Sequence, residues 1–126
     1  MSEPARVVAL GGGVAGDAAA LRAAQLGAKA TIIERAELGG TCLNWGCIPT
    51  KALLATADLL RKIRRADEFG LVVPEASFDF PRMMARKDEI VLRQRNGVEG
   101  TAKRKGVEVV RGQGRVEDGA VVVDGE

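Results

Sequence analysis

Short β-branched runs and an alanine-rich run alternate in the first third of the chain. Residues 6–10, Arg-Val-Val-Ala-Leu, form a brief apolar run of the kind found in buried parallel strands. Residues 29–34, Lys-Ala-Thr-Ile-Ile-Glu, repeat that character. Between them, residues 17–26 are rich in alanine and leucine, which are strong helix formers, and Gly27 provides a helix C-cap. The pattern therefore predicts a strand, a helix and a second strand, the unit from which parallel sheets are built.

The rest of the chain predicts two long helices followed by three strands. The first helix begins near Pro49, whose fixed φ suits a first turn, and continues through the apolar run at 51–60. A second helix, with Ser77 or Asp79 as its cap, has apolar positions at helical spacing as far as residue 105. Valine-rich segments then predict a strand at 107–111 and two more at 112–117 and 120–124, joined by a turn at Glu117-Asp118-Gly119.

Length and composition limit the classes of function. With 126 residues, of which 46% are hydrophobic and 29% charged, the chain is an ordinary globular domain and one domain at most. The net charge of +2 comes from 19 basic residues scattered among 17 acidic ones, without a basic stripe, so nucleic acid is not an expected partner. No apolar run approaches the length of a membrane span, and the opening Met-Ser-Glu-Pro-Ala-Arg does not resemble a signal peptide. We therefore expect a protein of the reducing cytoplasm with no membrane partner.

A glycine-rich turn connects the first predicted strand to the first predicted helix. Gly11, Gly13 and Gly16 satisfy G-x-G-x-x-G in the strand–turn–helix context that this pattern requires. Gly11 would make the tight turn, Gly13 would let a pyrophosphate approach the helix N-terminus, and Gly16 would let helix and strand pack closely. Glu34 ends the second strand 18 residues after Gly16, where its carboxylate can bind ribose hydroxyls. The segment therefore predicts dinucleotide binding.

Arg35 directly follows Glu34 and is a further candidate for a cofactor contact. Its charge would suit a 2′-phosphate, but the Glu34 carboxylate would repel such a group. A solvated surface position is therefore the simpler interpretation of Arg35.

Both cysteines lie in residues 39–51, Gly-Gly-Thr-Cys-Leu-Asn-Trp-Gly-Cys-Ile-Pro-Thr-Lys. Cys47 falls at or just before the N-terminus of the following helix, where the dipole and free N–H groups favour a thiolate over a thiol. Cys42 lies within reach on the preceding turn, and the pair predicts a redox-active dithiol. Two thiolates without a histidine cannot complete a zinc site, and a disulfide closing so short a loop would stabilise little. Two buried, inert cysteines are the other interpretation of the residues alone.

The segment from Gly39 to Lys51 resembles, nearly residue for residue, the active-site segment of the FAD-dependent pyridine nucleotide–disulfide oxidoreductases. Its form, Cys-Leu-Asn-x-Gly-Cys-Ile-Pro-[Ser/Thr]-Lys, is most similar to that of the dihydrolipoamide dehydrogenases. The resemblance implies that the glycine motif binds FAD and that NAD uses a second motif later in the chain. The implied fold class is α/β: a truncated, Rossmann-like FAD-binding domain with a parallel sheet, helices and a small antiparallel excursion.

The resemblance also implies roles for individual residues. Cys42 would be the interchange thiol that reacts with dihydrolipoamide, and Cys47 the flavin-side sulfur that relays electrons to FAD. We expect Cys42 to be the more accessible of the two in the reduced whole enzyme. Lys51, one helical turn beyond Cys47, could stabilise negative charge on reduced flavin, with a solvated helix lysine as the alternative. The implied cofactor-binding positions are Gly11, Gly13, Gly16, Glu34, Arg35, Gly40, Thr41, Cys42, Cys47, Lys51 and Gly114, and no metal is implied.

Residues 1–126 correspond to the N-terminal portion of the family's FAD-binding domain, and we expect the NAD-binding and dimerisation domains to be absent from this chain. The dimerisation domain supplies the histidine that acts as acid and base, and this chain has no histidine. The implied activity carries electrons from dihydrolipoamide through the Cys42–Cys47 disulfide and FAD to NAD, with this chain inactive on its own. The implied partners are a second copy, as a homodimer, and the lipoyl-bearing component of 2-oxo acid dehydrogenase complexes. A mercuric or glutathione-type disulfide reductase, or a non-catalytic flavin-binding or structural fragment, is the alternative.

Overall fold

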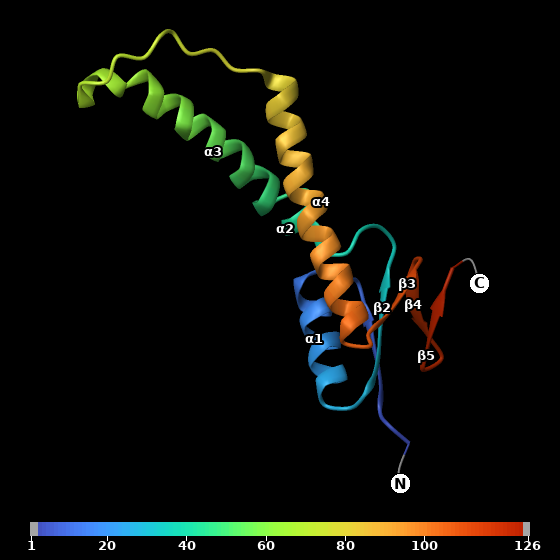
Figure 1. Cartoon of the computed structure of the whole chain (residues 1–126). Coiled ribbons are helices and arrows are strands. Elements are labelled where there is room, and N and C mark those ends of the chain that lie inside the picture. The colour runs from blue at the N-terminus through green and yellow to red at the C-terminus, as the bar shows by residue number, and fades with distance from the viewer. Residues whose placement is uncertain (1–2, 125–126) are drawn as a thin grey trace.

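The computed structural model describes residues 3–124 and builds them around a three-stranded parallel sheet (Figure 1). Strand β1 (Arg6–Leu10) pairs with β2 (Lys29–Glu34), and β2 pairs in turn with β3 (Glu108–Arg111). Helix α1 (Val14–Gln25) connects β1 to β2. The α/β fold and the strand–helix–strand unit predicted from the sequence are therefore confirmed.

The connection from β2 to β3 is long and helical. It contains the short helix α2 (Gly40–Asn44), the long helix α3 (Cys47–Arg64), a 3₁₀ turn η1 (Ala66–Phe69) and the helix α4 (Phe80–Arg104). Figure 1 shows α3 and the first half of α4 extending away from the sheet, and the second half of α4 returning to it. Of the two expected caps of α4, Asp79 is the one used, because its carboxylate accepts a hydrogen bond of 2.9 Å from the Arg82 N–H.

The hydrophobic core lies between the sheet and the two helices α1 and α4. Ala30 and Ile32 of β2 belong to it, since alternate residues of a strand point to the same face. Ile32 is fully buried, which is worth roughly 1.5–3 kcal/mol for a side chain of its size. Small residues let the helices approach the sheet closely. The buried members of the core are Ala20, Ala30, Ile32, Leu38, Ala102 and Val107.

A β-hairpin follows the sheet. Strands β4 (Gly114–Glu117) and β5 (Ala120–Val123) are antiparallel and are joined through Asp118 and Gly119, both of which have positive φ. That pair of left-handed residues matches the twist of a two-residue hairpin. The predicted turn is confirmed, although the first strand begins at residue 114 rather than at 112.

Strand β1 differs from the expectation that it would be buried. Val8 is 42% exposed and Leu10 is 46% exposed. Among residues 3–124, β1 pairs only with β2, so it forms an edge of the sheet. Parallel strands normally have both faces covered, and here one face of β1 is open to solvent.

Candidate functional site

The glycine loop between β1 and α1 has the backbone geometry that its sequence predicts. Gly11 has a φ of +99°, a conformation that favours glycine, and its N–H donates to the Ile33 carbonyl at 2.8 Å. A β-carbon on Gly16 would lie 1.9 Å from the Gly11 carbonyl oxygen, so only glycine fits at the start of α1. Gly13 is the N-cap of α1, and its nearest neighbour, the Gly40 α-carbon, would lie 3.9 Å from an added β-carbon.

The glycine loop contacts the cysteine segment directly. A β-carbon on Gly40 would lie 2.8 Å from the Gly13 α-carbon. The Gly39 N–H donates a hydrogen bond of 2.7 Å to the Gly12 carbonyl. The two motifs that the sequence separates by more than twenty residues therefore form one continuous surface.

The Glu34 carboxylate is held by two backbone N–H groups. One oxygen, Oε2, accepts from the Gly12 N–H at 2.7 Å, and the other, Oε1, accepts from the Ala36 N–H at 2.8 Å. Each carboxylate oxygen has a second lone pair, so hydrogen bonds to a ligand remain available. Glu34 thus has a structural role in the glycine loop that the sequence pattern did not indicate.

A cleft of about 450 Å³ opens between the glycine loop, the end of β2, α2 and the start of β4. Gly114 and Leu10 both line it. They lie so close together that a β-carbon on Gly114 would be 2.6 Å from the Leu10 Cδ2. Arg35 is exposed at its edge, where the guanidinium donates to the Gln113 side chain at 3.3 Å. The expected cofactor-binding residues that line the cleft are Gly11, Glu34, Arg35, Gly40, Thr41 and Gly114. Those that lie outside its lining are Gly13, Gly16, Cys42, Cys47 and Lys51.

The two cysteines lie on consecutive helices and both are free thiols. Cys42 lies in the middle of α2, and Cys47 is the first residue of α3, as the sequence predicts. Gly46 joins the two helices closely, because a β-carbon there would lie 3.0 Å from the Thr41 carbonyl oxygen. Lys51 is exposed one turn further along α3.

The two cysteines differ in exposure in this chain, and the expectation for the reduced whole enzyme stays a prediction. Cys42 is half-buried and Cys47 is exposed. Helix α2, which carries Cys42, packs against α3 and α4. Within residues 3–124, the surface in front of Cys47 is open to solvent.

The environment of Cys42 makes its proton harder to remove. A hydrogen bond to the Cys47 side chain raises the pKa of the Cys42 thiol, and partial burial and the nearby negative charge of Cys47 raise it further. A backbone hydrogen bond at Cys47 and the positive charge of Lys51 act in the opposite direction. The direction of this shift reflects the proximity of the two cysteines, which lie on consecutive helices joined by Gly46.

A buried side chain of the cysteine segment, Asn44, was not recognised from the sequence. It is 8% exposed and bonds to the backbone of its own segment and to Arg95 of α4. The only sequence signal was its position between the two cysteines, and Arg95 gave none.

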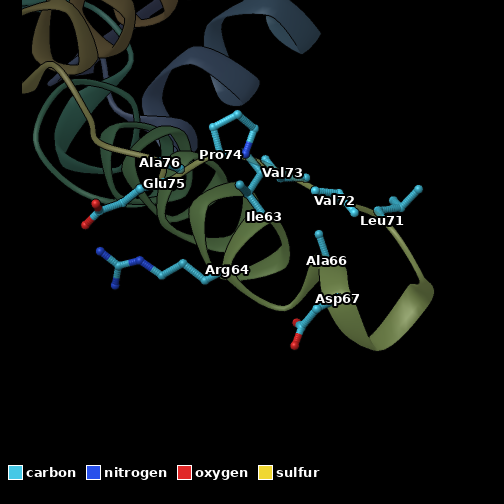
Figure 2. Close-up of a pocket in the computed structure, with 10 residues that line it drawn as sticks. All are labelled: Ile63, Arg64, Ala66, Asp67, Leu71, Val72, Val73, Pro74, Glu75 and Ala76. Atoms are coloured by element: carbon cyan, nitrogen blue, oxygen red, sulfur yellow. The ribbon is translucent and has the colours of Figure 1, made fainter.

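A separate hollow of about 580 Å³ lies at the far end of α3, where the chain turns into the linker before α4. Figure 2 shows linker residues along one side of it, with the charged ends of Arg64 and Glu75 pointing away from Val72 and Leu71. It contains neither cysteine nor any residue of the glycine loop, so we assign the chemistry to the cleft and the dithiol. Its lining is Ile63, Arg64, Ala66, Asp67, Leu71, Val72, Val73, Pro74, Glu75 and Ala76.

Two kinds of feature are absent from residues 3–124. No helix there combines the length and the apolar character needed to cross a bilayer. The same residues contain no group of three or more acidic, cysteine or histidine side chains arranged to hold a metal ion.

Comparisons with known proteins agree on one family. Residues 5–126 match the family described as "Pyridine nucleotide-disulphide oxidoreductase". A dihydrolipoyl dehydrogenase of Chlamydia muridarum is 46% identical over 114 residues, which is 90% of this chain and 24% of that protein. A dihydrolipoyl dehydrogenase of Bacillus subtilis is 46% identical over 110 residues, 87% of this chain and 23% of that protein. The chain therefore spans about a quarter of the length of such curated relatives.

A solved structure has the same arrangement. The crystal structure of LpdA from Mycobacterium tuberculosis superimposes with a TM-score of 0.83 and 31% sequence identity. The match covers 90% of this chain and 25% of that one. The match therefore corresponds to about a quarter of that larger chain.

Proposed function

This chain belongs to the pyridine nucleotide-disulphide oxidoreductase family, and from that premise we propose that it is the part of a dihydrolipoyl dehydrogenase that holds FAD and carries the redox-active dithiol. The single observation that supports this most directly is the Cys42–Cys47 pair. Gly46, the residue before Cys47, packs so closely on Cys42 that a β-carbon on it would lie 3.4 Å from the Cys42 α-carbon, and Gly40 of the same segment contacts Gly13 of the glycine loop.

The residues present fit a dinucleotide. Gly13 keeps its outer side free, with no atom nearer than 3.9 Å to a β-carbon placed there, at the N-terminus of a 12-residue helix. Free N–H groups and the dipole at such a terminus favour a pyrophosphate. Glu34 and the cleft beside it would hold the ribose and the adenine side, with Gly114 and Arg35 at the rim. FAD, when bound, supplies two-electron redox chemistry beside the dithiol.

As a disulfide, the cysteine pair would accept two electrons from a dithiol substrate. In the proposed reaction, dihydrolipoamide attacks one sulfur of the Cys42–Cys47 disulfide as a thiolate, and a mixed disulfide forms while the other cysteine leaves as a thiolate. The second sulfur of dihydrolipoamide then displaces the protein sulfur, closing the lipoamide ring. Two electrons and two protons leave dihydrolipoamide, and the protein gains a dithiol. We assign the exchange with substrate to Cys42 and the flavin-side position to Cys47, with Lys51 one turn away.

The proposal also covers the final electron acceptor, the oligomeric state and the partner of the whole protein. We propose that NAD is the final acceptor at a site outside residues 1–126. We further propose that the whole protein acts as a cytoplasmic homodimer and serves the lipoyl-bearing component of a 2-oxo acid dehydrogenase complex. The dihydrolipoyl dehydrogenases that resemble this chain support the general role, and the quarter-length match leaves the rest to experiment.

An anaerobic flavin experiment tests the proposed function. The purified chain is mixed with FAD, the flavin spectrum is recorded, and dihydrolipoamide is added. We expect binding to the protein to perturb the absorption spectrum of FAD. Dihydrolipoamide should then bleach the bound flavin in the wild type but not in Cys42→Ala or Cys47→Ala. A flavin spectrum that the protein leaves unperturbed would contradict the proposal. So would bleaching in both variants to the extent seen in the wild type. NADH with lipoamide should give no turnover with this chain alone.

A further inference from the structure

The side-chain amide of Asn44 joins three segments of the fold. Its Nδ2 donates to the Leu38 carbonyl at 2.9 Å and to the Gly40 carbonyl at 3.0 Å. Its Oδ1 accepts from the Arg95 Nε at 2.9 Å. Both amide hydrogens and the amide oxygen are therefore used, which is the requirement for a polar side chain that is only 8% exposed.

These partners determine which way the amide points. In the opposite orientation, the oxygen would face two carbonyl oxygens and the NH₂ group would face a guanidinium. Both contacts would be repulsive, so the hydrogen-bond partners alone select the orientation found. The site is complementary to an asparagine and to no other side chain of that shape.

Arg95 continues the connection beyond Asn44. Its Nη1 lies 3.3 Å from the Glu37 Oε1, so one guanidinium bonds both to α2 and to the loop that follows β2. The side chain of Arg95 is 24% exposed. A charged donor that is largely withdrawn from water makes a stronger hydrogen bond than a solvated one.

Helix α2 needs such support because a helix of its length is not stable by itself. It has five residues, fewer than an isolated helix requires, and its N-cap, Gly39, has no side chain to cap it. Cys42 lies in the middle of this helix, two residues from Asn44. The position of the Cys42 sulfur relative to Cys47 on α3 therefore depends on how firmly α2 is held against α4.

We propose that Asn44 and Arg95 are positioning residues that hold Cys42 against Cys47 and thereby set the equilibrium between the dithiol and the disulfide. The proposal rests on the redox role proposed above for the two cysteines. Neither residue touches the reacting sulfurs in this role. They act by raising the effective concentration of one sulfur at the other, which is the quantity that governs intramolecular disulfide formation.

The equilibrium can be measured on the chain without flavin, NAD or lipoamide. In glutathione buffers, the dithiol and one glutathione disulfide give the protein disulfide and two glutathione thiols, with two electrons passing from the cysteines to glutathione. Alkylation followed by mass spectrometry gives the oxidised fraction at each buffer ratio. Because hydrogen bonds to charged groups have free energies near those of a tenfold equilibrium change, we expect the constant for disulfide formation to fall about tenfold in Asn44→Ala and in Arg95→Ala.

Three further variants separate positioning from a general structural effect. Asn44→Asp keeps the shape and the Arg95 contact but places an acceptor against two carbonyls, so it should shift the equilibrium as far as Asn44→Ala. The double variant should shift it little further than either single one, because both remove the same support. Arg93→Ala removes an exposed arginine of α4 two residues away and should leave the equilibrium at the wild-type value.

The outcomes are distinguishable. If folded Asn44→Ala and Arg95→Ala match the wild type, or if Arg93→Ala shifts as far as they do, the positioning role is wrong while the redox role stands. If the wild type forms no disulfide in any buffer, the redox role fails and the positioning role fails with it. Circular dichroism establishes which variants fold. Should Asn44→Ala not fold, Arg95→Ala and the partly rescuing Arg95→Lys decide the matter.

Discussion

Gly13 and Gly40 form an asymmetric backbone contact between the glycine loop and the cysteine segment. A β-carbon on Gly40 would lie 2.8 Å from the Gly13 α-carbon, whereas one on Gly13 would lie 3.9 Å from the Gly40 α-carbon. Gly40 also has a φ of +62°. The contact therefore tolerates a methyl group on one partner and not on the other.

This asymmetry separates folding from cofactor binding. We expect Gly40→Ala to lower the free energy of unfolding by roughly 1–2 kcal/mol from the left-handed backbone alone, with a further loss from the clash. Gly13→Ala should leave the unfolding free energy nearly unchanged and weaken FAD binding, since the methyl group would occupy the approach to the helix N-terminus.

Urea unfolding and FAD titration measure the two effects. Gly97→Ala is the control, because a β-carbon there meets nothing within 4 Å and alanine favours the interior of α4. Normal FAD affinity in Gly13→Ala would refute the assignment of this surface to a pyrophosphate.

Glu34 provides a second prediction, because its carboxylate bonds to Gly12 and Ala36 in the protein itself. Glu34→Gln places an NH₂ group against one of these two N–H donors. The part-buried Gly12 N–H is then left with no acceptor or with only a neutral amide oxygen, and a loss of this kind costs about 1–3 kcal/mol, so urea unfolding should show a loss toward the lower end of that range. Glu75→Gln, at an exposed carboxylate of the linker, should show none. Equal stability of both variants would mean that Glu34 matters only for a ligand.

The elements that were predicted correctly depend on short stretches of sequence. The strand at 6–10, the glycine turn, the helix and the strand at 29–34 succeed one another along the chain, and their periodicity and turn chemistry are local. The contact that brings Asn44 to Arg95 joins residues 51 positions apart. No pattern in a single sequence specifies such a pair, because it results from where α4 packs.

The exposure of the sulfurs shows a different limit. A helix N-terminus can be recognised from sequence, and Cys47 lies at one. How much solvent reaches a side chain depends on every surface packed against it, so the greater exposure of Cys47 in residues 3–124 does not follow from its position at a helix N-terminus. The edge position of β1 has the same origin, because burial of a strand depends on its neighbours in the sheet.

The interaction between the thiols predicts an unusual pH dependence. Since a hydrogen bond to Cys47 raises the pKa of Cys42, less of Cys42 is thiolate at a given pH than in an ordinary thiol. Alkylation of Cys42 should therefore increase at higher pH than is usual. Cys47→Ala removes the hydrogen bond and the negative charge, and should move the pH profile of Cys42 to lower pH.

Lys51 should act in the opposite direction. Its positive charge lowers the pKa of Cys42, so Lys51→Met should move the profile to higher pH. The measurement is the rate of iodoacetamide alkylation at Cys42, followed by mass spectrometry across a pH series. Arg93→Met is the matched control for loss of a distant positive charge. Shifts of the same sign in Cys47→Ala and Lys51→Met would contradict the assignment.

The last prediction connects accessibility to the proposed cofactor. In the chain without flavin, brief alkylation at a pH where both thiols react should label the exposed Cys47 before the half-buried Cys42. If Cys47 is the flavin-side sulfur, saturating FAD should slow its labelling severalfold and leave Cys42 nearly unaffected, so that the order reverses. ADP can occupy the cleft beside Glu34 but has no flavin ring, and should therefore protect neither thiol. Gly13→Ala, which we expect to bind FAD poorly, should keep the order of the free chain. Protection of Cys42 instead of Cys47 by FAD would exchange the roles proposed for the two sulfurs, because the ring would then lie over α2 rather than over the start of α3.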